Sequence, residues 1–321
     1  MLDVTVRPMR EDDLGVADHV MRVAFGTFLG MPDPTTFMGD ANYVGTRWRA
    51  DPEAAWVATA DDNVVGSNFV STWGSFGFFG PLTVRPDLWN QRVAQRLLEP
   101  VIDTFEARGV THAGLYTFSH SQKHVALYQK FGFWPRHLIA MLSCAIPDAP
   151  PTADHGSLAD SLTLFSGQPV AAQEDTLREA RALTNTIYDG LDVSSEIRSV
   201  FAQHLGDTVL VRDEGGLVAF AVCHVGAGTE AGSGACYVKF AAAKPGSRAA
   251  PEFARLVRAC EDFAARRGVA RLVVGMNTAR EFAYRHLLAH GFRIDRLGVA
   301  MERPSDGGYN RRDVHVIDDW R

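Results

Sequence analysis

The residues best suited to chemistry begin with an extended segment that leads into a helix. Leu82, Thr83 and Val84 precede Pro86, which cannot continue a sheet. Apolar residues then recur at steps of three and four, so one face of the following helix is buried: Val93, Leu97, Leu98, Val101, Ile102 and Phe105. Asn90 is the expected N-cap. Because the first N–H groups of a helix lack partners and its dipole adds positive potential, this arrangement predicts an anion site.

A second stretch holds groups that can move protons. A strand is expected over Gly114 to Phe118, and a helix over Ser121 to Phe131. His120 and His124 lie between the strand end and the first helical turn, and imidazole titrates near neutral pH. Either histidine can serve as a general base, directly or through water, and we place His120 first. A histidine near a site is nevertheless more often a hydrogen-bonding or surface residue.

The order of these elements resembles the GNAT superfamily of acyl-CoA-dependent N-acyltransferases. The resemblance rests on Val84-Arg85-Pro86, the turn, the helix and the strand, and on Leu127-Tyr128-Gln129-Lys130-Phe131-Gly132-Phe133. In that family the turn reads Gln/Arg-x-x-Gly-x-Gly/Ala and holds the CoA pyrophosphate on backbone amides. The matching positions here are Trp89, Arg92 and Ala94, of which only Ala94 keeps the pattern.

The resemblance assigns roles to individual residues. It implies that Tyr128 protonates the departing CoA thiolate, which suits a phenol with a pKa of about 10. Ser121 stands where the family often has Asn, and its hydroxyl can still contact CoA. The implied acetyl-CoA-binding residues are Leu82, Thr83, Val84, Trp89, Asn90, Gln91, Arg92, Val93, Ala94, Gln95 and Ser121.

Length and repetition predict two domains. The chain has 321 residues, and Gly109-Val110 to Gly132-Phe133 spans as many positions as Gly268-Val269 to Gly291-Phe292. A repeat of roughly 150 residues indicates two copies of one domain rather than a solenoid. We therefore expect an α/β (α+β) fold with two tandem GNAT-like domains, each a mixed, mostly antiparallel sheet flanked by helices. The expected boundaries are 1–148 for the catalytic domain, 149–157 for a Pro-rich linker and 158–321 for the second domain.

Turn residues and apolar runs predict further strands. Hairpins are expected around residues 61–63 and 213–216, and a single strand over Trp73 to Val84. After Phe133, the segment Arg136 to Ile146 is expected to close the sheet of the first domain. The terminal Trp320 favours docking of the last segment.

The second copy is expected to be degenerate. Its tyrosine position is occupied by Leu287, while Tyr284 lies almost one turn away. Its loop, 241–251, carries Lys244 and Arg248 but no recognisable phosphate motif. We expect this copy to shape the amine pocket and to contribute acidic groups, with Asp189, Asp192 and Glu196 as its candidates. In the first copy the candidates are Asp33 and Asp40, and a solvated carboxylate explains each of the five as well or better.

Composition restricts the class of partner and the compartment. The chain is 46% hydrophobic and 22% charged with a net charge of −6, so it offers no basic excess for nucleic acid. Its four cysteines show no metal-ligand spacing, and we expect no metal and buried thiols in a reducing compartment. The first residues have no apolar core of a signal peptide, and no run of 18 apolar residues occurs. We expect a cytoplasmic protein without membrane partners.

The resemblance therefore implies an acetyl-CoA-dependent N-acetyltransferase acting by direct attack of a primary amine in a ternary complex. Two alternatives stay open: a non-catalytic acyl-CoA-binding sensor or scaffold, or catalysis in the second copy. The acceptor is a small-molecule amine, an amino acid or a peptide amine, and the protein is a monomer or a homodimer.

Overall fold

The computed structural model describes residues 3–147 and 162–321, so the expected linker at 149–157 lies outside the described residues. The first half of the chain contains β1 Thr5–Pro8, α1 Leu14–Phe28, α2 Val44–Ala50, β2 Ala55–Ala60, β3 Asn63–Trp73, β4 Phe76–Phe79, β5 Thr83–Val84, α3 Val93–Ala107, β6 His112–Thr117, α4 Gln122–Gln129 and β7 Trp134–Ala145. The second half contains β8 Thr163–Leu164, α5 Val170–Ile187, α6 Ser194–Ala202, β9 Gly206–Asp213, β10 Gly216–Gly226, β11 Gly232–Ala243, α7 Ala249–Arg266, β12 Arg271–Asn277, α8 Glu281–Ala289, β13 Arg293–Arg303 and β14 Val316–Ile317.

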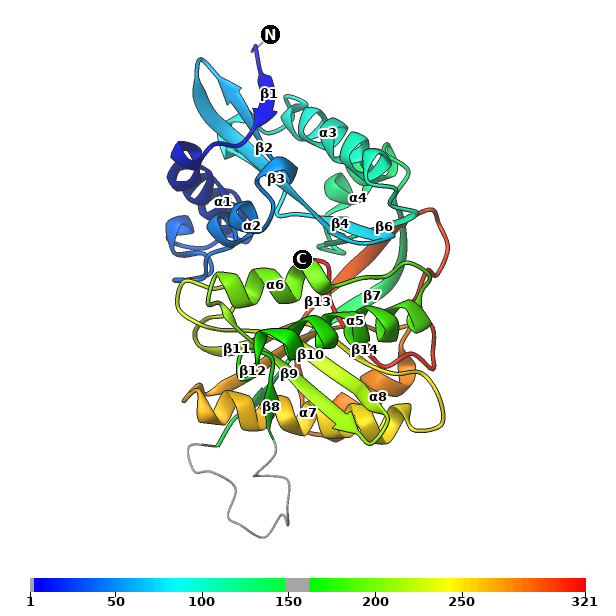
Figure 1. Ribbon diagram of the computed structural model, residues 1–321. Helices are drawn as coiled ribbons and strands as arrows, with labels where there is room; N and C mark the ends of the chain where they lie inside the picture. Colours follow the sequence, from blue (N-terminus) through cyan, green and yellow to red (C-terminus); the bar gives the residue numbers. More distant parts are fainter. Residues whose placement is uncertain (1–2, 148–161) are drawn as a thin grey trace.

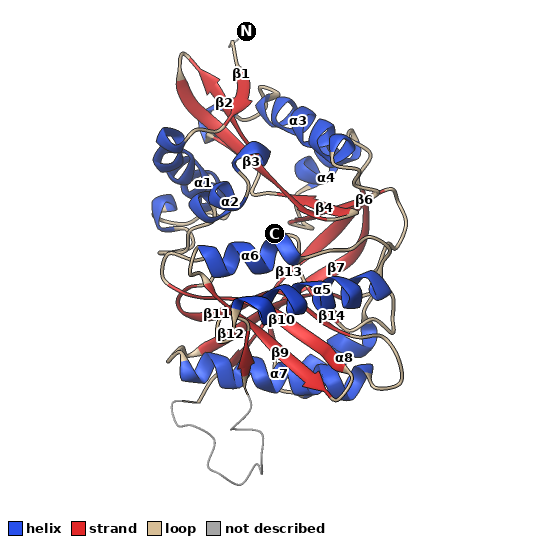
Figure 2. Ribbon diagram, in the orientation of Figure 1, coloured by secondary structure: helices blue, strands red, loops and turns tan. Residues whose placement is uncertain are grey.

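One mixed, mostly antiparallel sheet runs through both halves. Its order is β1-β2-β3-β4-β6-β13-β7-β12-β11-β10-β9-β8, and only β4–β6 and β11–β12 pair in parallel. Helices cover both faces of the sheet, as Figure 2 shows for α5 and α6 against α7 and α8. The expected mixed α/β architecture is confirmed. The element order β-β-β-α-β-α-β runs from β9 to β13, and it recurs from β2 to β7 with one additional short strand, β5, before the first helix.

The last strands of the two halves are exchanged. We expected the segment after Phe133 to close the sheet of its own half, but β7 pairs with β12 and β13. The partner of β6 is instead β13, with Val299 opposite Thr117 and Met301 opposite Leu115. Figure 1 shows these two strands crossing between the halves. Each half therefore depends on the other to pair its central strand.

Local sequence explains most element boundaries. Asp61 and Asp62 both adopt positive φ between β2 and β3, as a tight hairpin requires. In α3 the residues facing the core are Val93, Leu97, Leu98, Val101 and Phe105, as the spacing predicts. This helix continues through Pro100. The expected single strand over Trp73 to Val84 is wrong, because β4 pairs with β6 whereas β5 pairs with β3.

The final segment of the chain crosses the sheet on one face. β14 pairs with β11, and the following Trp320 is buried against Phe76 and Tyr309. The indole lies over Gly114 of β6, where a Cβ atom would approach Trp320 Cε3 to 2.5 Å. Buried Arg280 anchors the same segment through Asp318, at 2.6 Å. A residue without a side chain is thus required on β6.

Gly114→Ala tests this close approach. The added methyl group forces the indole to move, so we expect the free energy of unfolding to fall by about 1–3 kcal/mol. Chemical denaturation followed by circular dichroism measures it. Gly15→Ala is the matched control, because Gly15 lies in α1 with open space around its Cα, and there we expect a gain of about 0.5–1 kcal/mol. Equal stability of the Gly114→Ala variant and the wild type would contradict the packing described.

Candidate active site

A cavity opens where the two parallel strands β4 and β6 separate. They pair only through Phe76–His112, Gly77–Ala113 and Phe78–Gly114. Beyond these pairs, Gly80 turns away to bond Phe69, and the chain continues into β5 beside β3. The cavity has a volume of about 1060 Å³ and is lined by both halves of the chain. Its position follows from the loss of strand pairing.

The structure brings together nearly all residues expected to bind the cosubstrate. Those lining the cavity are Leu82, Thr83, Val84, Trp89, Asn90, Arg92, Val93, Ala94, Gln95 and Ser121. Both Tyr128 and His120 line it as well. Gln91 is the exception, since it is exposed and its side-chain nitrogen lies 3.5 Å from the Asp87 carbonyl oxygen.

The turn before α3 keeps its left-handed backbone without a glycine. Arg92 adopts φ = 64° and is the N-cap of α3, so the expected N-cap at Asn90 is wrong. The helix begins at Val93, and the Arg92 carbonyl accepts from Gln95 at 3.1 Å. The first helical N–H groups, at Val93 and Ala94, belong to residues that line the cavity. An anion is favoured at this end, where Arg92 also adds a cationic side chain.

A further cation lies near this end of the cavity. The Lys123 ammonium of α4 lies 5.3 Å from the centre of the Trp89 ring, and Lys130, the residue after α4, lines the cavity as well. Ser121 lies at the start of the same helix, where its hydroxyl accepts from the His124 backbone N–H at 3.4 Å. Ser121 therefore caps α4 as well as lining the cavity. Cationic side chains and helix starts together suit a phosphate-bearing ligand.

Tyr128 is placed to give up a proton. It is buried, packs edge-to-face on Phe79 at 5.7 Å and hydrogen-bonds Thr117 of β6. Burial raises the pKa of Tyr128 well above its ordinary value, although the bond to Thr117 opposes the shift. The phenol is therefore fully protonated at neutral pH and can act as a general acid.

The two candidate histidines belong to an aromatic wall. Phe28 at the end of α1 stacks on His120 at 5.6 Å and contacts His124 at 5.0 Å and Phe118 at 5.1 Å. Burial lowers the pKa of His124, and the neighbouring Lys123 and His120 lower it further. His120 is exposed on the same wall. Both rings thus shape the cavity, and His124 is neutral at pH 7.

The second half supplies the opposite end of the cavity. Its lining residues there include Glu230, Tyr237, Arg296, Trp320 and Arg321. No motif in the sequence indicated these residues, because they lie on β11, the loop before it, the exchanged strand β13 and the final segment, which only the folded chain brings to the cavity. The buried Trp320 was the one available signal, since a terminal tryptophan favours docking.

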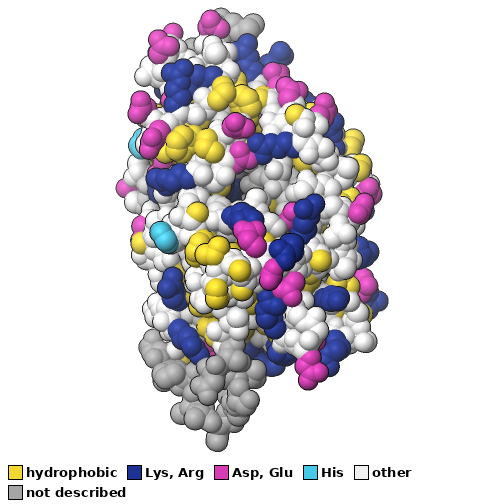
Figure 3. Space-filling model, viewed as in Figure 1, with side chains coloured by type: hydrophobic (Ala, Val, Ile, Leu, Met, Phe, Trp, Pro, Cys, Tyr) yellow, Lys and Arg dark blue, Asp and Glu magenta, His cyan; other side chains and the backbone are white. Residues whose placement is uncertain are grey.

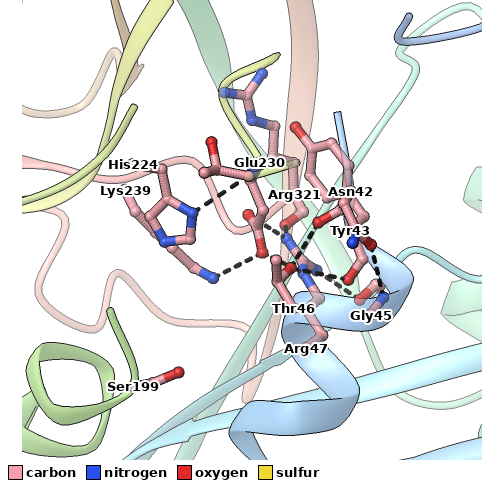
Figure 4. A network of polar contacts seen from close by, with 12 residues as sticks. Asn42, Tyr43, Gly45, Thr46, Arg47, Ser199, His224, Glu230, Lys239 and Arg321 are labelled. Carbon is pink, nitrogen blue, oxygen red and sulfur yellow. Dashed lines mark hydrogen bonds and ion pairs between the residues drawn. The ribbon is translucent and has the colours of Figure 1, made fainter. Parts of the chain in front are cut away.

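A buried ionic network joins the halves beside this end (Figure 4). Arg47 of α2 donates to Glu230 at 2.9 and 3.1 Å, and Lys239 of β11 donates to the same carboxylate at 2.8 Å. Lys239 also lies 3.2 Å from Glu196 of α6. Burial opposes ionisation of Glu196, but the charge of Lys239 and the contact with His224 hold its pKa at about 2. Both carboxylates are therefore ionised.

The acidic residues expected to meet an amine lie elsewhere. Asp33 accepts from Thr35, Asp40 accepts from Ser233, and neither lines the cavity. The candidates Asp189, Asp192 and Glu196 do not line it either. The acidic residues of the second half that line the cavity are Glu230, which is bound by Arg47, and Asp295 of β13. Among the described residues no group of three His, Cys, Asp or Glu side chains is placed to hold a metal ion.

The corresponding space of the second half is filled. There β11 and β12 pair in parallel only through residues 235–238 and 271–274. Beyond that point β14 pairs with β11, and its Ile317 is buried in the core together with Leu287. The separation between the parallel strands is thus occupied by the chain itself.

The comparisons with known proteins agree with this geometry. Residues 23–133 match the model of the acetyltransferase (GNAT) family. This segment is a GNAT acetyltransferase domain. It contains the turn before α3, both candidate histidines and Tyr128. No curated protein matches the chain in sequence.

Solved structures share the fold of the GNAT segment and of the remainder. A protein from Pyrococcus horikoshii classed as an acetyltransferase superposes with a TM-score of 0.66 at 11% identity, over 99% of this chain and 95% of that one. A GCN5-related N-acetyltransferase from Sphaerobacter thermophilus gives 0.57 at 14% identity, over 94% and 95%. The glucosamine N-acetyltransferase region of a fungal multi-domain GH3 β-N-acetylglucosaminidase gives 0.61 at 15% identity, over 94% and 38%. At these identities the likeness establishes the fold alone.

The surface of the protein carries both signs of charge. On the face in Figure 3, basic and acidic side chains are interspersed rather than gathered by sign. None of the helices in residues 3–147 and 162–321 has the length and hydropathy needed to span a membrane.

The causes of the lowered pKa of His124 can be tested by removing the neighbouring charge of Lys123. In a Lys123→Met variant we expect this pKa to rise towards its ordinary value of 6.5 but to stay below it, because burial is the larger cause. NMR titration of the imidazole C–H signals measures it. A folded-state pKa below the unfolded value also means that His124 lowers stability as the pH falls below 6.5. Lys130→Met, directly after the same helix, is the control that leaves the pKa of His124 unchanged. An unchanged pKa in Lys123→Met itself would contradict the geometry.

Proposed function

We propose that this protein is an acetyl-CoA-dependent N-acetyltransferase whose cosubstrate binds in the cavity between β4 and β6. The observation that carries the proposal is the meeting, in one cavity, of the helix start at Val93 and Ala94 with the buried phenol of Tyr128. Backbone N–H groups, with Arg92, Lys123 and Lys130, suit the phosphates of CoA. The separated strand, with Leu82 to Val84, offers backbone groups to the pantetheine arm.

The chain's own groups account for the steps on the thiol side. The acceptor is a primary amine of a small molecule or peptide, whose nitrogen attacks the thioester carbonyl while both substrates are bound. The new C–N bond forms and the C–S bond breaks. Tyr128 gives its proton to the departing thiolate, which a phenol held protonated by burial can do at neutral pH.

Two features favour this reading over catalysis in the second half. There Leu287 stands at the tyrosine position and is fully buried, and β14 with Ile317 fills the space between the parallel strands.

The cysteines at 144, 223, 236 and 260 are all free thiols, which supports a reducing, cytoplasmic location.

Calorimetric titration of acetyl-CoA tests the binding site. We expect one site per chain in the wild type and loss of binding in Ala94→Glu, because a carboxylate at the helix start repels the phosphates. The double variant Lys244→Glu/Arg248→Glu, at the corresponding loop of the second half, is the control and should bind normally. Loss of binding only in that double variant would move the site to the second half. If the wild type does not bind acetyl-CoA, the enzyme proposal fails and the scaffold alternative is favoured.

Tyr128→Phe tests the general acid. The phenyl ring keeps the packing on Phe79, so we expect acetyl-CoA affinity to persist while kcat falls about 10²-fold to 10⁴-fold. Thiol release from acetyl-CoA in the presence of primary amines measures the rate. Tyr284→Phe, on the corresponding helix of the second half, should leave kcat unchanged. An undiminished kcat in Tyr128→Phe would remove Tyr128 from the mechanism.

A further inference from the structure

The proposed transfer also releases a proton from the amine, and a second tyrosine of the cavity is paired with a carboxylate. Tyr237 of β11 lines the cavity, and its hydroxyl donates to Asp319, with both carboxylate oxygens at 3.1 Å. Tyr237 and Asp319 are almost fully buried. Among the described residues, the first half contributes no carboxylate to the cavity wall, whereas the second half contributes Asp295 of β13 and Glu230, which is bound by Arg47 and Lys239. The hydrogen-bonded pair therefore joins the cavity to a buried proton acceptor.

Asp319 is held in place by its surroundings. It lies over Gly275 of β12, where a Cβ atom would approach the Asp319 Cβ to 2.1 Å. This position of β12 therefore requires a residue without a side chain. The Arg321 side chain lies 3.4 Å from its carboxylate and 4.0 Å from the centre of the Tyr237 ring. Burial raises the pKa of Asp319, although Arg321 opposes the shift. Because of this position, the carboxylate is a stronger base than a solvated aspartate.

The pair lies on the face of the sheet opposite to Tyr128. Neighbouring side chains of a strand point to opposite faces, and on β6 Thr117 bonds Tyr128. The preceding residue, Tyr116, is close enough to Asp319 and Arg321 for their charges to act on its hydroxyl. The cavity therefore passes between the strands from the Tyr128 face to the face of Tyr237. A thiol leaving on one face and an amine arriving from the other need proton-transferring groups on both.

A second tyrosine–aspartate pair shows what a purely structural pair looks like here. Tyr309 donates to Asp318 at 2.5 Å, and Asp318 is bound by the buried Arg280. Neither Tyr309 nor Asp318 lines the cavity. The two neighbouring aspartates thus bind two tyrosines, and only the Tyr237 pair reaches the cavity.

We propose that Tyr237 and Asp319 form the proton-accepting end of the acceptor site. The inference rests on the proposed function. As the amine nitrogen bonds to the thioester carbon, its proton passes to the Tyr237 oxygen while the Tyr237 proton passes to Asp319. The C–S bond breaks, and the thiolate receives the Tyr128 proton. Asp319 has then gained one proton and Tyr128 has lost one, and exchange with solvent restores both. Tyr237 is the catalytic residue, and Asp319 acts through it.

The charged and titratable groups around Asp319 define the pH response. They are Arg321 and Asp318 in the same segment, Tyr237 on β11, Tyr116 on β6 and Tyr43 at the start of α2. The other titratable groups of this set do not replace Asp319 as proton acceptor. Asp318 is bound to Arg280. Burial raises the pKa of all three tyrosines, so that they stay protonated at neutral pH. The rate is therefore expected to fall as the pH falls through the raised pKa of Asp319.

The test compares Tyr237→Phe and Asp319→Asn with the wild type, using acetyl-CoA and a saturating concentration of ethylamine, an acceptor small enough for any pocket. We expect kcat to fall about 10²-fold or more in both variants. We expect acetyl-CoA affinity, measured by calorimetry, to stay within twofold of the wild type. The wild-type decline of kcat at low pH should be lost in Asp319→Asn, a change that a structural role would not produce.

Tyr309→Phe is the matched control, because it removes a phenol hydroxyl from the pair behind the cavity. Its kcat should stay within twofold of the wild type, and thermal unfolding of all variants identifies any that fail to fold. Normal kcat and an unchanged pH profile in Tyr237→Phe would overturn the inference while leaving the proposed function intact. Absence of thiol release by the wild type, with acetyl-CoA bound, would overturn both.

Discussion

The pairing of β6 with β13 is the constraint on which the rest of this structure depends. β6 is the central strand of the first half, and on its β4 side it is paired over three residues only. Its other edge is paired over residues 113–117 with a strand that lies more than 170 positions further along the chain. The side chains of His112 and Glu302 add a contact of 2.8 Å between the same two strands. An unpaired central strand would leave a row of backbone groups without partners. The two halves therefore fold as one unit around their exchanged strands.

This strand exchange buries charged side chains between the two halves, where an unpaired charge would destabilise the fold. Removing Arg47, Glu230, Lys239 and Glu196 from water costs several kcal/mol for each ion. The contacts return that free energy only with good geometry, and here Glu230 accepts from both cations at 2.8 to 3.1 Å. Arg47 also donates to the carbonyls of Gly80 and Arg321. One guanidinium thus contacts the strand break of the first half, the loop before β11 and the final segment. The network determines how the two halves lie beside the cavity.

The sequence predicted the elements well and their pairing poorly. Periodicity located α3, the hairpins at 61–62 and 213–216, and the helix carrying Tyr128, because these depend on neighbouring residues. It placed β7 in the wrong sheet position, because an exchanged strand has the same local pattern as one that stays with its own half. It placed the helix start at Asn90, since a non-glycine residue with φ = 64° at Arg92 has no sequence signature. Tyr237 and Asp319 were missed because 82 positions separate them and nothing in their spacing marks a contact.

The final segment explains why two halves of similar topology differ in use. Each has a pair of parallel strands that separate, and a separated pair leaves backbone groups that must find partners. In the second half β14 supplies these partners from within the chain, through Ala241–Ile317 and Ala242–Val316. The same segment then continues across Gly275 and Gly114, so that Trp320 and Arg321 become part of the cavity wall of the first half. A segment that fills one opening therefore helps to build the other, and loss of ligand access in the second half is the condition for completing the site in the first.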